Sequence, residues 1–386
     1  MKNPFVNEAR EPGVEPLEMD MEEKAVRPRR SRRLKWIIAG AIILVALAVG
    51  LGVGLGLGLN NGGDDDDEGG SSPPSAPSPT GTVTNRTFWQ PAAGVSWQIV
   101  LLNPITIADD ATTATPDVDV YDIDLFTNNQ STITKLHSLN KKVICYFSAG
   151  SYEPNRPDSD QFTATDKGKG LDGWPGEVWL QTNSDNVRKI MSTRIKLASD
   201  KGCDAIDPDN VDGFVRPPFS PPFFLSLKIT STTEICMSVS ADLRSPQQND
   251  NGLGLTANDT VNFMQYLSDE ASKYNMSTGL KNAGDVIDDV LPYTHFSVNE
   301  QCAEYSECAL FAPFVEAGKP VFHIEYPKDA PSVSTEDADS LCSRTGKSAG
   351  SDNFSTVIKK MNLDGWVEYC DRSTSTTSTV STSSSS

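Results

Sequence analysis

The stretch Cys203-Asp204-Ala205-Ile206-Asp207-Pro208-Asp209-Asn210 is a short strand with carboxylates at its C-terminal end. The sequence predicts seven further short strands, at 97–102, 118–126, 142–149, 277–282, 296–301, 320–326 and 354–358. Helical patterns lie between strands, as at 186–201 and 257–274, and the second begins with a capping signal from Thr256 and Asp259. Strands that alternate with helices in this way predict an α/β fold, namely a (β/α)8 barrel of the TIM type.

A doubly wound parallel sheet is the alternative fold. It is disfavoured because neither G-x-G-x-x-G nor G-x-x-x-x-G-K-[ST] follows a strand, which also argues against a nucleotide cofactor. The three histidines occur in no H-E-x-x-H motif, and the chain has neither C-x-x-C nor G-x-S-x-G. We therefore expect no metal and no cofactor.

Carboxylates cluster at the C-terminal strand ends, where barrel enzymes carry their chemistry. Period-two alternation places Asp122 and Asp124 on one face of their strand, and Asp207 and Asp209 on one face of theirs. Two converging carboxylates are what glycoside hydrolysis requires, one to protonate the leaving oxygen and one to attack or to activate water. Asp209 and Glu300, on the fourth and sixth strands, are the best catalytic pair.

The remaining polar residues at these strand ends are candidates for substrate binding, namely Asp122, Asp124, Tyr146, Asp207, Lys281, Asn282 and Glu325. Asp207 lies one pleat deeper than Asp209, so we expect it to tune the pKa of its neighbour through like charge. His323 alternates with Glu325 on the seventh strand. It either lines the pocket or bonds to a neighbouring strand.

Charge divides the chain into segments. The formal net charge of −19 excludes a typical nucleic-acid binder, which needs a basic footprint. Residues 1–35 have a net charge of +2 and are predicted to be a disordered cytosolic tail. Residues 36–59 are uncharged and long enough for one transmembrane helix. The rest of the chain therefore has a net charge of −21. The basic flank before this span and the acidic flank after it predict a single-pass type II membrane protein whose catalytic domain is extracellular.

Composition sets the limits of the folded region. Residues 60–83 are predicted to be an acidic Gly/Ser/Pro stalk, 84–372 the barrel domain and 373–386 a Ser/Thr-rich disordered tail. All seven cysteines follow the membrane span, as do five N-glycosylation sequons, at Asn85, Asn129, Asn258, Asn275 and Asn353. Both features predict a disulfide-bonded glycoprotein in an oxidising exterior. We expect the catalytic domain to be monomeric.

Seven short motifs follow one another along the chain: WQ at 97–98, YDIDLF at 121–126, VICYFSAG at 143–150, PDNVDG at 208–213, GLKN at 279–282, VNEQC at 298–302 and KPVFHIEY at 319–326. In this order they resemble glycoside hydrolase family 114, the endo-α-1,4-polygalactosaminidases, over nearly all of 88–370. The resemblance implies a (β/α)8 barrel that cleaves polymers of α-1,4-linked galactosamine. The family's catalytic Asp and Glu match Asp209 and Glu300. By analogy with related barrels, Asp209 is the nucleophile and Glu300 the acid/base of a retaining mechanism.

The implied substrate is a cationic galactosamine-containing polysaccharide, which an acidic domain attracts. The resemblance implies that its ammonium groups pair with carboxylates, for which the candidates are Asp122, Asp124, Asp207 and Glu325. Many relatives have Glu at the position of Asp207, so we expect altered affinity there. A non-hydrolytic, surface glycan-binding protein on the same barrel is the alternative function. The intact pair Asp209 and Glu300 favours the enzyme.

Residues 215–247 interrupt the resemblance, because relatives continue from the equivalent of Phe214 directly into the segment that starts at Gln248. The extra 33 residues contain five prolines and Cys236, the unpaired cysteine. We interpret them as a retained intron, since Val codons begin with GT, a Gln codon can end with AG, and removal leaves six cysteines. The alternative is a genuine loop at the catalytic face.

The six other cysteines suggest three disulfides. Cys302 and Cys308 are the favoured pair, because they would close a short loop just after Glu300. Two further pairings are plausible, Cys342 with Cys370 and Cys145 with Cys203. The sequence leaves the connectivity open.

Overall fold

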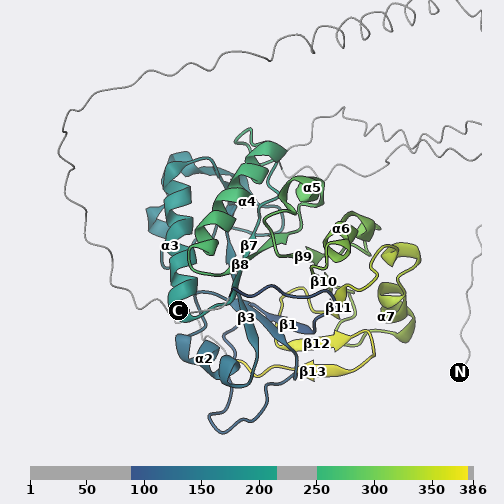
Figure 1. The fold of residues 1–386 in the computed structure, drawn as a ribbon. Helices are drawn as coiled ribbons and strands as arrows, with labels where there is room; N and C mark the ends of the chain where they lie inside the picture. The colour runs from purple at the N-terminus through teal and green to yellow at the C-terminus, as the bar shows by residue number, and fades with distance from the viewer. Residues whose placement is uncertain (1–87, 215–249, 381–386) are drawn as a thin grey trace, which may run out of the picture. The chain divides into compact units, whose positions relative to one another are not determined.

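The computed structural model describes residues 88–214 and 250–380. Its centre is a ten-stranded sheet in which the first eight strands are parallel (Figure 1). In sheet order these eight are β1 (Trp97–Val100), β2 (Val120–Asp124), β3 (Lys142–Ser148), β7 (Ala205–Asp209), β8 (Ser277–Lys281), β9 (Phe296–Glu300), β10 (Val321–Glu325) and β11 (Ser355–Ile358). Each of the eight strands expected from the sequence is present.

The strands follow one another around the sheet in chain order. A doubly wound sheet would reverse direction at a switch point, so that alternative is wrong. The sheet also curls, which brings β1 close to β11: the Trp97 indole Nε1 donates to the Ser355 carbonyl oxygen at 2.7 Å, and Ser355 Oγ donates to the Val95 carbonyl at 2.6 Å. A curled sheet with this order is consistent with a TIM-like barrel.

Helices follow most of the parallel strands. They are α2 (Gln130–Ser138), α3 (Asp185–Lys201), α4 (Ala257–Ser272), α5 (Ile287–Val290), α6 (Ala312–Glu316) and α7 (Thr335–Cys342), with 3-10 turns η1 (Ser159–Gln161), η2 (Ala164–Asp166), η3 (Gly284–Val286), η4 (Cys308–Leu310) and η5 (Gly346–Ser348). The predicted cap of α4 is confirmed, since Thr256 and Asp259 form a reciprocal capping box.

Two departures from a regular (β/α)8 pattern shape the fold. Within the described part of the chain, no helix joins β1 to β2, and β11 leads into two antiparallel strands, β12 (Trp366–Tyr369) and β13 (Thr374–Thr376). Between β3 and α3 the chain inserts a separate sheet in the order β4 (Ser151–Tyr152), β6 (Val178–Leu180) and β5 (Lys167–Gly170). These strands have only two to four residues each, and β5 contains two glycines, so they gave no strand signal in the sequence.

The prediction of a disordered tail over 373–386 is wrong for its first eight residues. β13 pairs with β12, the Thr106 amide donates to the Ser378 carbonyl, and Gln98 Nε2 donates to Thr377 Oγ1. Threonine is compatible with strands because it is β-branched, so a Ser/Thr-rich composition alone does not preclude pairing. The folded region therefore extends past residue 372 to residue 380.

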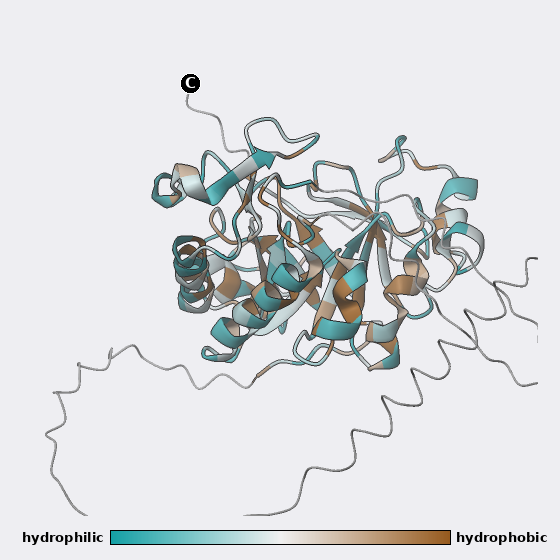
Figure 2. Cartoon of the chain, turned by 90° about the horizontal axis from the view of Figure 1, so that it is seen from above, coloured by the Kyte–Doolittle hydropathy of each residue, from teal (hydrophilic) through white to brown (hydrophobic). Residues whose placement is uncertain are grey.

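Apolar side chains form two cores, one on each face of the curled sheet. Inside it lie Trp97, Ile99, Val120, Ile144, Ala205, Phe296, Val298, Phe322, Ile324 and Val357. The larger core contains residues of the opposite strand faces, such as Ile123, Phe147 and Ile206, together with helix residues such as Ile195 and Phe263. Figure 2 shows that hydrophobic segments concentrate on the strands, while much of the helix surface is hydrophilic.

Several predicted segments lie outside the described residues, namely 1–35, 36–59, 60–83, 215–247 and 381–386. No described helix combines the length and the apolar character that a membrane span requires. The three suggested disulfides are all confirmed, joining Cys145 to Cys203, Cys302 to Cys308 and Cys342 to Cys370.

We predict that Trp97→Phe destabilises the fold by about 1 to 3 kcal/mol, because it leaves the buried Ser355 carbonyl without its donor between β1 and β11. Urea unfolding followed by circular dichroism measures the loss. Trp366→Phe, at a partly buried position on β12, is the control and should change the free energy of unfolding by less than Trp97→Phe. Equal effects of the two substitutions would contradict the role of the indole hydrogen bond.

Candidate active site

Three functional side chains occupy the last positions of neighbouring strands. Asp209 ends β7, Lys281 ends β8 and Glu300 ends β9. The residue after each has a left-handed backbone, with φ of 59° at Asn210, 48° at Asn282 and 62° at Gln301. Asparagine adopts this conformation more readily than most residues, and here it lets the chain turn sharply away from the strand end. The three charged groups therefore meet at one rim.

Lys281 connects the two predicted catalytic carboxylates. Its Nζ lies 3.2 Å from Asp209 Oδ2 and 3.6 Å from Glu300 Oε2. These two oxygens can therefore be no farther apart than the total of both distances, 6.8 Å. Lys281 is only 2% exposed, yet the neighbouring carboxylates hold its pKa above the usual lysine value against the opposing effect of burial. Its ammonium is thus charged and fixed between the two acids.

Each carboxylate also receives neutral donors. Tyr146 Oη donates to Asp209 Oδ2 at 2.8 Å, and the Asn210 amide donates to Asp209 Oδ1 at 2.7 Å. On the other side, Tyr326 Oη donates to Glu300 Oε1, and Asn282 Nδ2 donates to Glu300 Oε2 at 3.2 Å. Burial raises the pKa of both tyrosines, so they remain protonated donors.

A close backbone approach fixes the end of β7. The amides of Ala149 and Gly150 donate to the Asp209 carbonyl at 2.8 and 3.0 Å. A Cβ atom at Gly150 would lie 1.7 Å from the Asn210 carbonyl oxygen, which is not possible without moving the backbone. Glycine is therefore required at position 150 for Asp209 to stand where it does.

Asp122 and Asp207 lie below this rim and are fully buried. Among the described residues, no hydrogen-bond donor reaches their carboxyl oxygens, and the ammonium of Lys281 is 4.0 Å from Asp207 Oδ2. Burial is the main cause that raises the pKa of both groups, and the negative charge of neighbouring carboxylates raises it further. Neither lines the cavity described below, so their assignment to ammonium binding is corrected. They instead form the floor beneath Lys281.

Asp124 and Glu325 are also misassigned as substrate-binding residues. Asp124 Oδ1 accepts the amides of Phe126 and Thr127 at 3.0 and 2.8 Å, and its Oδ2 pairs with Arg156 at 2.7 Å. Its charge is therefore already used to hold the start of the following loop. Glu325 is 1% exposed and faces away from the inner core, because Ile324 occupies the inner face at that end of β10.

Glu325 instead supports the loop that follows Glu300. Its Oε1 accepts the Ala303 amide at 2.7 Å and contacts His323 Nε2 at 2.8 Å. His323 Nδ1 contacts Thr356 Oγ1 on β11 at 3.0 Å, so the structural alternative for this histidine is the correct one. These contacts hold the loop from behind.

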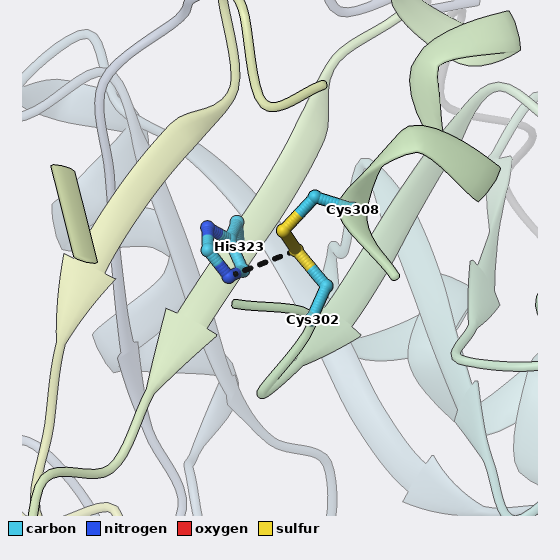
Figure 3. Close-up of side chains that lie close together, drawn as sticks. All are labelled: Cys302, Cys308 and His323. Carbon is cyan, nitrogen blue, oxygen red and sulfur yellow. Dashed lines mark hydrogen bonds between the residues drawn. A yellow bond between two sulfur atoms is a disulfide. The ribbon is translucent and has the colours of Figure 1, made fainter. Parts of the chain in front are cut away.

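One group of potential metal ligands occurs in the described residues, namely Cys302, Cys308 and His323. Figure 3 shows that the two sulfur atoms are joined in a disulfide, with His323 Nε2 3.2 Å from Cys302 Sγ. Metal binding by cysteine requires the thiolate, which a disulfide does not offer. The group therefore serves as a buried brace beside Glu300.

A cavity of about 880 Å³ opens over the rim and is lined by Asp209, Lys281 and Glu300. Of the predicted binding residues, Tyr146, Lys281 and Asn282 line it. A smaller cavity of about 140 Å³ shares Asp212, Asn282 and Glu300 with the first. Both volumes lie at the C-terminal end of the strands, where the chemistry was expected.

The sequence interpretation missed several residues of this site. Tyr326 lies one residue beyond Glu325, and alternation from Ile324 would have placed it on the inner face. Asp212 lies in the quoted PDNVDG motif, and burial together with Asp209 and Glu300 raises its pKa to about 7. Glu177 belongs to the inserted sheet and had no strand-end signal. Burial and the neighbouring Glu153 raise its pKa to about 7.

A profile of the glycoside-hydrolase family GH114 matches residues 78–375, most of the chain. The chain belongs to family GH114. Among solved structures, that of Aspergillus fumigatus Ega3 in complex with galactosamine has 47% sequence identity and a TM-score of 0.60, and covers 75% of this chain and 100% of that chain. The glycoside hydrolase domain of PelA from Pseudomonas aeruginosa has 11% sequence identity and a TM-score of 0.48, and covers 69% of this chain and 95% of that chain. No curated protein sequence matches the chain.

As a GH114 member, the chain is a glycoside hydrolase, which confirms the predicted enzyme class. The family resemblance drawn from the strand-end motifs is confirmed with it. The GH114 match extends to residue 375 and so includes part of the β12–β13 hairpin that the sequence had left outside the domain.

We predict that Asp212→Asn stabilises the protein increasingly as pH rises. The folded-state pKa of about 7 lies above the unfolded value near 4, so the fold binds this proton more tightly than the unfolded chain does. The unaltered protein therefore loses stability between about pH 4 and pH 7, whereas asparagine cannot ionise. The variant should gain about 1 to 3 kcal/mol relative to it over this range.

Guanidinium unfolding at pH 4 and pH 8 tests this expectation. Asp160→Asn is the control, since Asp160 is exposed and should give the same difference at both pH values. A pH-independent effect of Asp212→Asn would show that ionisation of this group does not oppose folding.

Proposed function

We propose that this protein is an endo-acting hydrolase of α-1,4-galactosaminidic bonds in galactosamine-rich polysaccharide, and that it uses a retaining two-carboxylate mechanism. The observation that carries the proposal is the pair Asp209 and Glu300, held on either side of Lys281 at the floor of the large cavity. Ega3, 47% identical, binds galactosamine in its crystal structure, which supports this sugar as the substrate unit.

Each carboxylate has one role in each of two steps. Glu300 gives its proton to the glycosidic oxygen while Asp209 attacks the anomeric carbon, which breaks the glycosidic bond and forms a glycosyl-enzyme ester. Glu300, now ionised, then removes a proton from water, whose oxygen displaces Asp209. Lys281 and Tyr146 position the Asp209 oxygen, and Tyr326 and Asn282 position Glu300.

The separation of the carboxylates favours retention of configuration. Retaining enzymes place the two groups roughly 5 to 5.5 Å apart, while inverting enzymes need roughly 6.5 to 9.5 Å to admit a water molecule. The Lys281 contacts limit the distance between Asp209 Oδ2 and Glu300 Oε2 to 6.8 Å, which supports the shorter, retaining arrangement.

The charge of the cavity fits a cationic polymer. Seven carboxylic side chains line the larger volume and only three basic ones, and all three basic groups, Lys281, Arg156 and Lys169, are already paired with acids. Amino groups of galactosamine are protonated near neutral pH, so they would relieve this excess of negative charge.

We predict that Asp209→Asn and Glu300→Gln each lower the rate of hydrolysis of deacetylated galactosaminogalactan by at least about 1,000-fold, since each removes a group that reacts. Release of short oligosaccharides, quantified by chromatography, is the measurement. Asp160→Asn, far from the strand ends in sequence and exposed, should retain full activity.

The same reaction followed by proton NMR should show the α-anomer as the first product. Initial release of the β-anomer would contradict the retaining mechanism but not the substrate. Binding of the polymer without any release would favour the alternative, a glycan-binding protein on the same fold.

We also propose that residues 215–247 are a translated intron. They lie outside the described residues, but the chain on either side of them is not separated in space: Asn251 Nδ2 donates to the Gly213 carbonyl, and the Lys169 amide donates to the Asn251 carbonyl at 2.9 Å. Without 215–247, two residues, Gln248 and Asn249, would join Phe214 to Asp250, and the contact between Gly213 and Asn251 brings these two ends within their reach.

Sequencing of cDNA across this region should give transcripts that join the Phe214 and Gln248 codons directly. The shorter protein should be active. Transcripts that retain the 99 nucleotides (33 codons) and yield active protein would show that the segment is a genuine loop.

A further inference from the structure

Large apolar side chains are unusually exposed around the catalytic carboxylates. In the described chain, five large hydrophobic residues are 49–56% exposed, and four of them line the two cavities. Leu102, Trp174 and Met361 border the larger cavity, and Tyr305 borders the smaller one. The fifth, Val380, lies elsewhere. Water-exposed apolar groups concentrated at one site indicate a surface that a ligand covers.

These residues come from four separate connections at the C-terminal rim. Leu102 follows β1, Trp174 lies between β5 and β6 of the inserted sheet, Tyr305 follows β9 and Met361 follows β11. No single element of the fold requires them to be exposed together. Their common feature is the cavity that they border.

The two cavities meet at the reacting groups. Glu300, Asp212 and Asn282 line both, so a ligand that fills both volumes passes over Glu300. The arms are unequal, since the larger is about 880 Å³ and the smaller about 140 Å³. The larger lies within the usual range for ligand sites, and the smaller has room for much less.

Both arms are acidic. The small arm is lined by four carboxylic side chains and, among the described residues, by no basic one. In the large arm Glu177 lies beside Glu153, and their mutual repulsion together with burial raises the pKa of Glu177 to about 7. Apolar platforms beside carboxylates suit a ligand with apolar ring faces and positive substituents, such as a chain of amino sugars.

We propose that the two cavities form one continuous binding cleft for a cationic amino-sugar chain, with Trp174 and Tyr305 as stacking platforms on opposite sides of the scissile bond and more sugar units held on the Trp174 side. This inference rests on the proposed function, because it takes Glu300 as the point of cleavage. Beyond that function, it specifies the path of the polymer across the protein and the residues that make binding depend on the length of the sugar chain.

The test measures binding of α-1,4-linked galactosamine oligomers of increasing length to the full-length protein carrying Glu300→Gln, by calorimetry. Adding Trp174→Ala should weaken binding of long oligomers about three- to ten-fold and that of the shortest ones less, because a stacked ring face is lost. Tyr305→Ala should weaken binding by a similar factor. Trp174→Phe should retain most of the affinity, since it keeps an aromatic face.

Val380→Ala is the matched control, an equally exposed apolar side chain outside the cleft, and should bind as the parent does. In the active enzyme, Trp174→Ala should raise KM for the polymer with kcat changed less than two-fold, whereas a misfolded variant would lose kcat. Unchanged binding of long oligomers by both Trp174→Ala and Tyr305→Ala would overturn the cleft while leaving the proposed function intact. Failure of the unaltered enzyme to cleave any galactosamine oligomer would overturn the proposed function itself.

Discussion

The buried ammonium of Lys281 is the interaction on which the site depends. It lies between Asp209 and Glu300 and above Asp207, so one positive charge holds together carboxylates that would otherwise repel one another in a region shielded from water. The fold meets this constraint by placing the three groups at the ends of adjacent parallel strands. Removing this charge would leave several buried acids uncompensated, which is a strongly unfavourable arrangement.

The two faces of the strands carry residues with different roles. The inner face presents Asp209, Lys281 and Glu300 to the cavity, with the apolar inner core beneath them. The outer face carries groups that hold the loops in place, such as Glu325 on the Ala303 amide and the disulfide beside His323. The inserted sheet and the long connections then build the walls of the larger cavity, and these are the parts in which related barrels can differ without altering Asp209 and Glu300.

Sequence reasoning found all eight parallel strands and the three disulfides, and it singled out Asp209 and Glu300, which the structure brings together at Lys281. It misplaced Glu325 because β10 is buried on both faces, and a strand with apolar residues on both faces gives no alternation from which to read direction. It misplaced Asp122 and Asp207 for another reason. Alternation identified their face correctly, but not their depth, which depends on how far each strand extends past its neighbours. Trp174 and Glu177 lie on short inserted elements without a strand-end motif, so nothing local singled them out.

The sequence by itself determined where the parallel strands lie along the chain, the chemistry of the strand ends and the family, because these follow from local patterns of apolar and charged residues along the chain. The tertiary structure alone decided which carboxylates reach the cavity, which hold loops in place, and which lie buried below Lys281. Those outcomes depend on distances between residues remote in sequence, since desolvation and ion pairing act through space. The initial list of acidic candidates thus resolves into a pair held on either side of Lys281, a buried floor and two structural supports.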